Sequence, residues 1–401
     1  MSLIKPQELI DELGVEGLCA TADTYFEDFD LSYEQMRKPF SNLTDSAHLL
    51  RSLGNLLAGL QVRRGMTVLE FGAGTCWLSR YLAQMGCATV SVDASAKALE
   101  LGREWFEHLP PALMPSPPQF IPFDGHRLDV PDKSVDRIIC FDAFHHVPNP
   151  GEVIAEFGRV LKPGGMVGLS EPGPHHSKTA QSQMEMRQFK VLENDIIIED
   201  IERWAKAGGF TNTWVELSGL NSPIAFTPRR VGRIAKLGSL PGLRTMMRII
   251  QGAVLALRNQ HTIYLAKGPL EIDSRWVEGL AHELTLIEAP QKAAAGEPFV
   301  VEIKVRNTGR ARWLRGAPDA AGTVRLAVLE GGGTTGLPAE LGRFLLPRSL
   351  APGEELQVPV ELSRDQPGRL DMRIDLVAEH IAWFENTGSD ALEIAVEIEP
   401  A

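Results

Sequence analysis

The most constraining feature of this chain is an apolar strand that runs directly into a glycine turn and a helix. Residues 68–79 read VLEFGAGTCWLS, and a second apolar segment, VSVD at 90–93, ends on an acid. Gly72 and Gly74 lack a Cβ, so their backbone can take unusual angles and a ligand can lie against it. Asp93 is expected at the tip of the second strand, where a carboxylate can accept both ribose hydroxyls. The pattern predicts an α/β fold that binds a nucleoside cofactor.

Length and composition indicate a soluble protein of two domains. A chain of 401 residues exceeds one ordinary domain, and its apolar (44%) and charged (23%) shares are those of globular proteins. The net charge of −12 argues against nucleic acid as a partner. The scattered cysteines show no metal-like spacing and favour a cytoplasmic setting. No signal peptide or membrane-spanning segment is expected, and the sequence leaves the oligomeric state open.

After a helical N-terminal cap at 1–66, apolar strand-like and helical segments alternate. Strands are expected at 67–71, 88–92, 118–122, 135–141, 165–170, 213–217 and 262–266. The alternation predicts a doubly wound, Rossmann-like sheet of seven strands, mostly parallel, with the last two forming a hairpin. The first domain is expected to cover residues 1–270.

A basic, apolar insertion at 218–260 splits that hairpin. Residues 217–270 contain no acid, yet the segment carries Arg229, Arg230, Arg233, Lys236, Arg244, Arg248 and Arg258. Such a helical surface, at 228–258, can contact a membrane face or grip an anionic, lipid-linked substrate. The alternative is a helical cap whose arginines are merely solvated.

From residue 271 to 401 the chain changes to short β-rich runs separated by glycine and proline turns. Runs such as FVVEIKV, TVRLAVLE and LDMRIDLV predict an immunoglobulin-like β-sandwich of roughly seven strands, without a cysteine pair. The region has no clustered histidines, cysteines or acid triad, so no catalysis is expected there. Trp313, Trp383 and Phe384 either stack on sugar rings or belong to the sandwich core.

Three further motifs follow the first two strands: IPFDGHRLD at 121–129, FDAFHH at 141–146 and RVLKPGG at 159–165. With the glycine loop and Asp93 they resemble the class I S-adenosylmethionine-dependent methyltransferases, of the methyltransferase type 11 kind, over about residues 40–210. Dinucleotide dehydrogenases do not carry the RVLKPGG turn at that place. The resemblance implies S-adenosylmethionine as the cofactor. It also implies an N-terminal lid that contains Phe26, Tyr33 and Phe40. The alternative is that these aromatics belong to the core.

Carried over residue by residue, the family pattern assigns cofactor contacts to the ends of four strands. The loop for the methionine part matches Glu70, Gly72, Ala73 and Gly74, and the ribose acid and its adenine-facing neighbour match Asp93 and Ala94. The adenine acid matches Asp124, flanked by Phe123 and Gly125, while Phe141 and Asp142 match the positions beside the sulfonium. Cys76 stands where the family has a third glycine, a position that mainly governs helix–strand packing.

Two histidine pairs follow the fourth and fifth strands, at the edge where such sheets bind ligands. A neutral imidazole can take a proton from an acceptor hydroxyl near pH 7, so His145 and His146 are candidate catalytic bases. Because adjacent residues point different ways, only one is expected to face the substrate, and His145 is favoured. The alternative is that both hold the loop that follows.

His175 and His176, with Glu171 at the end of the fifth strand, are expected to contact the substrate. With the first pair and Asp142 they can also surround a divalent metal. Doublets lack the i, i+4 spacing that places two ligands on one helix face, so no metal site is predicted. Nearby, Glu193 and Asp195, in a predicted helix, either border the pocket or lie on a solvated face.

The segments 306–313, 350–362 and 374–390 resemble an immunoglobulin-like module found on bacterial methyltransferases, glycosyltransferases and export proteins of surface-polysaccharide pathways. The resemblance implies O-methylation of a saccharide or glycolipid precursor, by a cytoplasmic enzyme that can lie peripherally at the inner membrane face. Two alternatives stay open. One is a small-molecule or quinone-like methyltransferase, and the other is a non-catalytic S-adenosylmethionine-binding scaffold of a polysaccharide assembly complex.

Overall fold

In a computed structural model, the chain forms two compact units, which are Met1–Val62 with Met66–Leu270, and Arg63–Gly65 with Glu271–Ala401. The structure describes residues 3–27, 35–110, 114, 116–216, 247, 251, 260–331 and 339–400. The units meet in sequence at the position of the expected domain boundary. Tyr33 and nearly all of the basic insertion at 218–260 lie outside the described residues.

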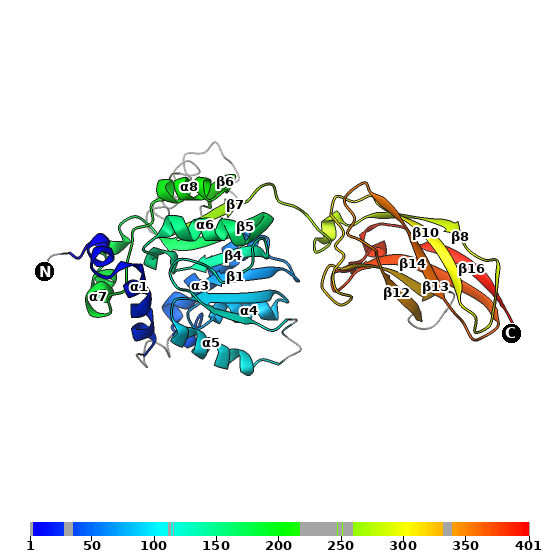
Figure 1. The fold of residues 1–401 in the computed structure, drawn as a ribbon, viewed down its shortest axis with the longest axis horizontal. Coiled ribbons are helices and arrows are strands. Elements are labelled where there is room, and N and C mark those ends of the chain that lie inside the picture. The colour runs from blue at the N-terminus through cyan, green and yellow to red at the C-terminus, as the bar shows by residue number, and fades with distance from the viewer. Residues whose placement is uncertain are drawn as a thin grey trace, which may run out of the picture. The chain divides into compact units, whose positions relative to one another are not determined.

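The first unit is built on a seven-stranded sheet of order β3-β2-β1-β4-β5-β7-β6 (Figure 1). Its strands are β1 (Thr67–Phe71), β2 (Ala88–Asp93), β3 (Gln119–Pro122), β4 (Val135–Phe141), β5 (Leu161–Pro172), β6 (Asn212–Glu216) and β7 (Gln260–Ala266). The first five pair in parallel, whereas β7 is antiparallel to both β5 and β6. The Rossmann-like sheet that the sequence predicts is therefore confirmed. The order in which strands are added to the sheet reverses between β1 and β4, which is where such folds bind ligands.

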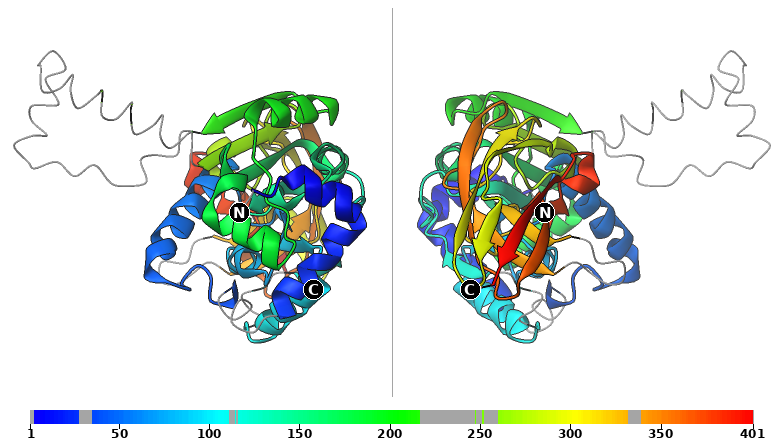
Figure 2. Two further views of the ribbon diagram at one scale, coloured as in Figure 1. Left: turned by 90° about the vertical axis from the view of Figure 1, so that its left-hand side faces the viewer. Right: turned by 90° about the vertical axis from the view of Figure 1, so that its right-hand side faces the viewer.

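Helices cover this sheet and close its carboxyl edge. They are α1 (Pro6–Glu27), α3 (Leu43–Gly59), α4 (Trp77–Gln84), α5 (Ala96–Glu107), α6 (Pro150–Val160), α7 (Ala180–Gln188) and α8 (Ile198–Ala207). The helix α1 lies beside α7, where Leu9 and Leu18 share a cluster with Met186 (Figure 2). Among the described residues, no helix combines the length and apolar character that crossing a bilayer requires.

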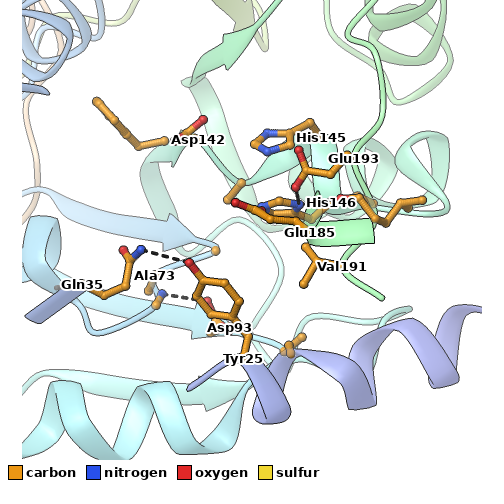
Figure 3. Close-up of a pocket in the computed structure, with 18 of the residues that line it drawn as sticks. Tyr25, Gln35, Ala73, Asp93, Asp142, His145, His146, Glu185, Val191 and Glu193 are labelled. Atoms are coloured by element: carbon orange, nitrogen blue, oxygen red, sulfur yellow. Dashed lines mark hydrogen bonds and ion pairs between the residues drawn. The ribbon is translucent and has the colours of Figure 1, made fainter. Parts of the chain in front are cut away.

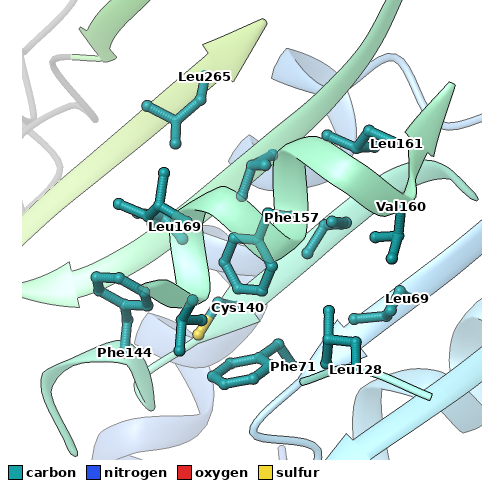
Figure 4. Packing of buried hydrophobic residues seen from close by; sticks show 14 of the residues in the cluster. Leu69, Phe71, Leu128, Cys140, Phe144, Phe157, Val160, Leu161, Leu169 and Leu265 are labelled. Carbon is teal, nitrogen blue, oxygen red and sulfur yellow. The ribbon is translucent and has the colours of Figure 1, made fainter. Parts of the chain in front are cut away.

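The main core of the first unit lies between the sheet and the helices α6 and α8. Side chains alternate along a strand, so Leu69 and Phe71 of β1 point to the face that α6 covers. Phe157 of α6 is completely buried there, with its ring centroid 5.1 Å from that of Phe71 (Figure 4). On the opposite face, Gly168 of β5 leaves space for α3, because an added Cβ would lie 2.9 Å from Leu56. The sheet is thus packed on both faces, as a parallel sheet requires.

The second unit consists of two sheets that share one core. One has the order β13-β10-β8 and the other the order β12-β11-β14-β16-β9, with β15 paired to β14. The strands are β8 (His282–Glu288), β9 (Lys292–Ala294), β10 (Phe299–Asn307), β11 (Val324–Glu330), β12 (Glu340–Leu345), β13 (Glu355–Leu362), β14 (Gly368–Ala378), β15 (Ala382–Trp383) and β16 (Leu392–Glu399). The strand-rich character is confirmed, and the immunoglobulin-like assignment stays a prediction.

The aromatic residues of the second unit are mostly core residues. Trp313 and Phe384 are completely buried and meet edge to face, with ring centroids 5.3 Å apart. A ring that is buried on both faces cannot stack on a sugar, so these two residues do not form a carbohydrate platform. Trp383 is half-buried, with the guanidinium of Arg343 over its ring.

We expect Phe157→Ala to lower the free energy of unfolding of the first unit by about 3–5 kcal/mol, because it leaves a cavity against Phe71. Urea unfolding of the full chain, followed by the circular dichroism of the helices, measures the change. The matched control is Phe40→Ala, at a ring that is 59% exposed, for which a change within about 0.5 kcal/mol is expected. Equal losses in the two variants would contradict this account of the core.

Candidate functional site

A pocket of about 640 Å³ opens at the carboxyl edge of the sheet, at the switch point between β1 and β4. Its floor is formed by residues at the ends of β1, β2 and β4 or directly after them, namely Gly72, Ala73, Gly74, Asp93, Ala94, Phe141 and Asp142. Side chains of α1, including Leu18 and Phe26, form the opposite wall. Figure 3 shows Asp93 on one side of the pocket and His145, His146 and Glu193 gathered on another. The volume suits a ligand of cofactor size.

The glycine loop and the tip of β2 form one hydrogen-bonded unit. Asp93 Oδ2 accepts from the Gly74 amide at 2.7 Å, and Oδ1 accepts from the Ser95 amide at 2.8 Å. Gly72 has φ +70°, and a Cβ added to it would lie only 2.2 Å from the Cβ of Ala143. The loop therefore needs glycine both for its backbone angle and for its close contact with the chain after β4.

Glu70 supports this loop from beneath instead of lining the pocket. The side chain is buried, and Oε2 accepts from the amide of Ser79 in the first turn of α4 at 2.7 Å. Burial raises the pKa of Glu70 to about 8. The residue before α4, Cys76, has a left-handed backbone and no side-chain cap, so Glu70 binds one of the free amides of this helix. Glu70 therefore holds the loop in place and does not make the cofactor contact that the sequence predicts.

Cys76 adopts the backbone angle of the glycine that it replaces, with φ +57°. Its thiol is accommodated by Gly102 of α5, because a Cβ at Gly102 would lie 2.5 Å from Cys76 Sγ. The expectation that this position governs packing is consistent with the geometry.

The segment after β3 places its residues differently from the family pattern. Phe123 and Gly125 line the pocket, whereas Asp124 is exposed and is not among the described residues that line it. Asp124 Oδ1 instead accepts from the amides of His126 and Arg127, at 2.8 and 2.9 Å. Gly125 has φ +94°, and a Cβ on it would lie 2.5 Å from Val15 of α1, so this glycine lets α1 approach.

His145 is held in place by Glu171. Both side chains are buried, and His145 Nδ1 lies 2.8 Å from Glu171 Oε2. Glu171 Oε1 also accepts from the amides of Ala143 and Phe144, at 3.1 and 2.9 Å. Burial lowers the pKa of His145, but the bond to Glu171 outweighs it and raises the pKa to about 9. Glu171 is therefore a positioning residue inside the protein, not the substrate contact that the sequence predicts.

His146 lies beside His145, with ring centroids 3.9 Å apart, because both belong to the 3-10 turn Phe144–His146. The expectation that the two adjacent rings point different ways is wrong, since both line the pocket. His146 Nδ1 lies 2.6 Å from the carbonyl oxygen of Leu192 and its side chain is 38% exposed. Burial and the neighbouring His145 lower the pKa of His146.

The second histidine pair divides between the pocket and the surface. His176 lines the pocket, and its Nε2 lies 2.6 Å from Glu193 Oε2. Burial raises the pKa of Glu193, but the contact with His176 outweighs it, and with the neighbouring imidazoles lowers the pKa to about 2. His175 is exposed and does not belong to the described pocket lining, so its predicted substrate contact is not supported.

The segment around Glu193 is extended and not the helix that the sequence predicts. Residues 190–197 have no helical structure, and Glu193 is only 2% exposed. Asp195 accepts from the amides of His175 and Ser177, at 3.1 and 2.8 Å, and so fixes the turn that carries His176. Glu193 thus borders the pocket, whereas Asp195 shapes the loop beneath it.

Sequence reasoning missed several polar residues that line the pocket. They are Tyr25, Gln35, Lys38, Asp45, His48, Gln181 and Glu185. They come from the N-terminal cap and from α7, and none belongs to a motif at the end of a strand. A periodic apolar pattern predicts where the helices lie. It does not predict which of their polar residues face the sheet edge.

A doubly wound sheet, a glycine loop and an acid at the tip of β2 define a protein that binds a nucleoside cofactor. Residues 69–169 match the profile of the methyltransferase domain family. An uncharacterized methyltransferase of Geobacillus sp. (strain WCH70) is 25% identical over 49% of this chain and 88% of its own length. A demethylmenaquinone methyltransferase of Tropheryma whipplei (strain Twist) is 30% identical over 35% of this chain and 54% of its own length.

Among solved structures, an S-adenosylmethionine-dependent methyltransferase from Mesorhizobium loti has a TM-score of 0.39 and 16% identity, over 54% of this chain and 97% of that one. Several curated relatives are matched over only 38% to 54% of their own length. The domain match supports a class I methyltransferase with S-adenosylmethionine as its cofactor, and leaves the substrate unspecified.

We expect Gly72→Ala to weaken the binding of S-adenosylhomocysteine by at least about tenfold, because the new methyl group strains a left-handed backbone and overlaps Ala143. Isothermal titration calorimetry measures the affinity. Gly54→Ala is the matched control, since no atom lies within 4 Å of a Cβ at that position in α3. Adding Ala143→Gly should restore part of the affinity of Gly72→Ala, and full affinity in Gly72→Ala alone would disprove this role of the loop.

Proposed function

We propose that the protein is an S-adenosylmethionine-dependent O-methyltransferase whose acceptor is a hydroxyl of a saccharide or glycolipid precursor in surface-polysaccharide biosynthesis. The observation that carries this proposal is the imidazole of His146 at the pocket wall. Its Nδ1 is engaged by the Leu192 carbonyl, so its Nε2 keeps a lone pair. A hydroxyl is a weak nucleophile that benefits from such a base.

The residues around the glycine loop fit the cofactor. A Cβ would fill the space at Gly72, and Asp93 keeps acceptor sites for ribose hydroxyls beyond its two amide bonds. Ala94, Phe123 and Gly125 would surround the base, and Phe141 with Asp142 would lie near the sulfonium. When bound, S-adenosylmethionine supplies an electrophilic methyl group.

On the acceptor side, His146 would take the proton of the hydroxyl at Nε2. The structure favours His146 over His145, which the sequence favours. The side chain of His146 is 38% exposed and its pKa is lowered, whereas that of His145 is 4% exposed and the bond to Glu171 raises its pKa to about 9. His176 and Glu193 would hold the acceptor in line for transfer, and alignment supplies much of the rate of a displacement reaction.

The N-terminal cap supports an acceptor with an apolar part. Ser41, Asp45 and His48 line the pocket, and the same segment exposes Phe40 (59%) and Leu43 (97%). A ligand with a polar and an apolar part would bind the polar pocket and cover these two side chains. A lipid-linked saccharide has both parts.

A second candidate is methylation of a quinone-like ring. It is favoured by the name of the Tropheryma whipplei relative, a demethylmenaquinone methyltransferase. The alternative of a non-catalytic scaffold predicts cofactor binding without turnover.

An acceptor screen separates these candidates. The full chain is incubated with S-adenosylmethionine and a panel of sugar nucleotides, lipid-linked saccharides and quinone precursors, and each product is tested by mass spectrometry for one added methylene unit. O-methylation of a saccharide supports the proposal, and C-methylation of a quinone ring supports the second candidate. Binding of S-adenosylhomocysteine with no product in any class supports the scaffold.

We expect His146→Gln to lower kcat with a saccharide acceptor by about 100-fold or more, while the affinity for S-adenosylhomocysteine stays within about twofold. Single-turnover kinetics and calorimetry measure the two quantities. His108→Gln, at an exposed position after α5, is the matched control and should keep the activity. An unchanged kcat in His146→Gln would remove His146 as the base.

We expect the affinity for S-adenosylhomocysteine to fall as the pH drops below about 6. Burial raises the pKa of Asp93 to about 6, against the lowering effect of the Ser95 and Gly74 amides. The ionised carboxylate is the form that accepts from the ribose, so below this pKa binding requires loss of a proton and the affinity decreases by up to about tenfold per pH unit. Calorimetry at several pH values measures the affinity for S-adenosylhomocysteine.

Asp93→Asn should bind more weakly at neutral pH and show a flatter pH profile, since the titrating carboxyl is gone. Asp11→Asn, at an exposed position of α1, should keep the wild-type profile. The same pH dependence in wild type and Asp93→Asn would contradict the assignment of Asp93.

A further inference from the structure

We propose that His145, His176 and Glu193 bind one divalent transition-metal ion at the acceptor side of the pocket. The three residues come from three segments, the turn after β4, the turn after β5 and the extended segment at 190–197. One ligand-type atom of each lies within 4.8 Å of the others. Two of the three residues, His176 and Glu193, are also the acceptor-side residues of the proposed function, so the ion would lie beside the acceptor.

The first observation is the way in which Glu171 orients His145. Glu171 is completely buried and engages Nδ1 of His145 at 2.8 Å, so Nε2 is the ring nitrogen left to bind an ion, which would displace its proton. Metal-binding histidines almost always present one ring nitrogen to the ion while the other donates to a carboxylate or a carbonyl. The ring of His145 also meets that of His176, with centroids 4.8 Å apart.

The second observation is a close contact that does not form a hydrogen bond. His176 Nε2 lies 2.6 Å from Glu193 Oε2, yet this nitrogen has no aligned hydrogen-bond partner among the described residues. Glu193 Oε1 is also buried without one, although His146 Nδ1 lies 3.4 Å away. Buried polar atoms are normally satisfied, so these two atoms require an explanation. A cation between them would satisfy both.

The ligand chemistry defines the class of ion. Two imidazole nitrogens and one carboxylate suit Zn²⁺ and similar first-row divalent ions, and three protein ligands leave positions open for water or substrate. An ion there would polarise the acceptor hydroxyl and ease its deprotonation. This role rests on the proposed function, whereas binding of the ion does not. The sequence alone argued against a metal because the histidine doublets lack the i, i+4 spacing that places two ligands on one helix face.

Titration with Co²⁺ tests the site in the full chain after removal of metals with a chelator. We expect one Co²⁺ per chain, with visible d–d absorption that reports ligation by the protein. His176→Ala and Glu193→Gln should each lose this signal, and Glu171→Gln should weaken binding by about 10- to 100-fold through the orientation of His145. His108→Ala, the matched surface control, should bind Co²⁺ like the wild type.

Circular dichroism and the affinity for S-adenosylhomocysteine show that each variant is folded and keeps its cofactor pocket. If one of the two ligand variants fails this check, His176→Asn replaces it. The proposal is overturned if the wild type shows no one-to-one site, which leaves only an ion pair between His176 and Glu193. It is also overturned if the folded variants bind Co²⁺ as tightly as the wild type.

Turnover provides a separate measurement. Chelation that lowers methyl transfer, with recovery on adding Zn²⁺, supports the role at the acceptor hydroxyl. Co²⁺ binding to a protein that has no methyltransferase activity would refute the proposed function and leave the metal site standing.

Discussion

The site depends on the close contact between the glycine loop and the chain that follows β4. Gly72 leaves no room for a side chain because Ala143 occupies the space, and Asp93 ties the loop to the next helix through two backbone amides. The contact brings the ends of β1, β2 and β4 into one rigid floor. The cofactor side and the acceptor side of the pocket therefore hold a defined position relative to each other.

Buried carboxylates organise the regions around that floor. Glu70 binds an amide at the start of α4, and Glu171 holds both the turn after β4 and the ring of His145. A buried carboxylate is costly unless it is hydrogen-bonded or paired, so each of these acids determines the geometry of its partners. Glu193 is the exception, because one of its oxygens has no hydrogen-bond partner among the described residues, and that exception points to the proposed metal ion.

Sequence reasoning located the strands along the chain and the glycine loop, because strand and loop signals are local. It failed where a side chain has two possible directions. Glu70 and Asp124 match family positions, yet their carboxylates bind backbone amides beside the pocket. The segment around Glu193 has the composition of a helix but is extended, because contacts with His145 and His176 override weak local propensity.

The sequence by itself determined the doubly wound sheet and the strand-rich second unit, because periodicity is a property of short segments. The cofactor class followed from the resemblance of short motifs to a known family. Only the tertiary structure decided which acids face the pocket and that His145, His146 and His176 meet in one cluster. His145 and His146 belong to the turn after β4 and His176 to the turn after β5, and the separation of these two turns in space depends on the packing of the whole sheet. The distance between the two turns therefore cannot be predicted from a pattern within a short segment.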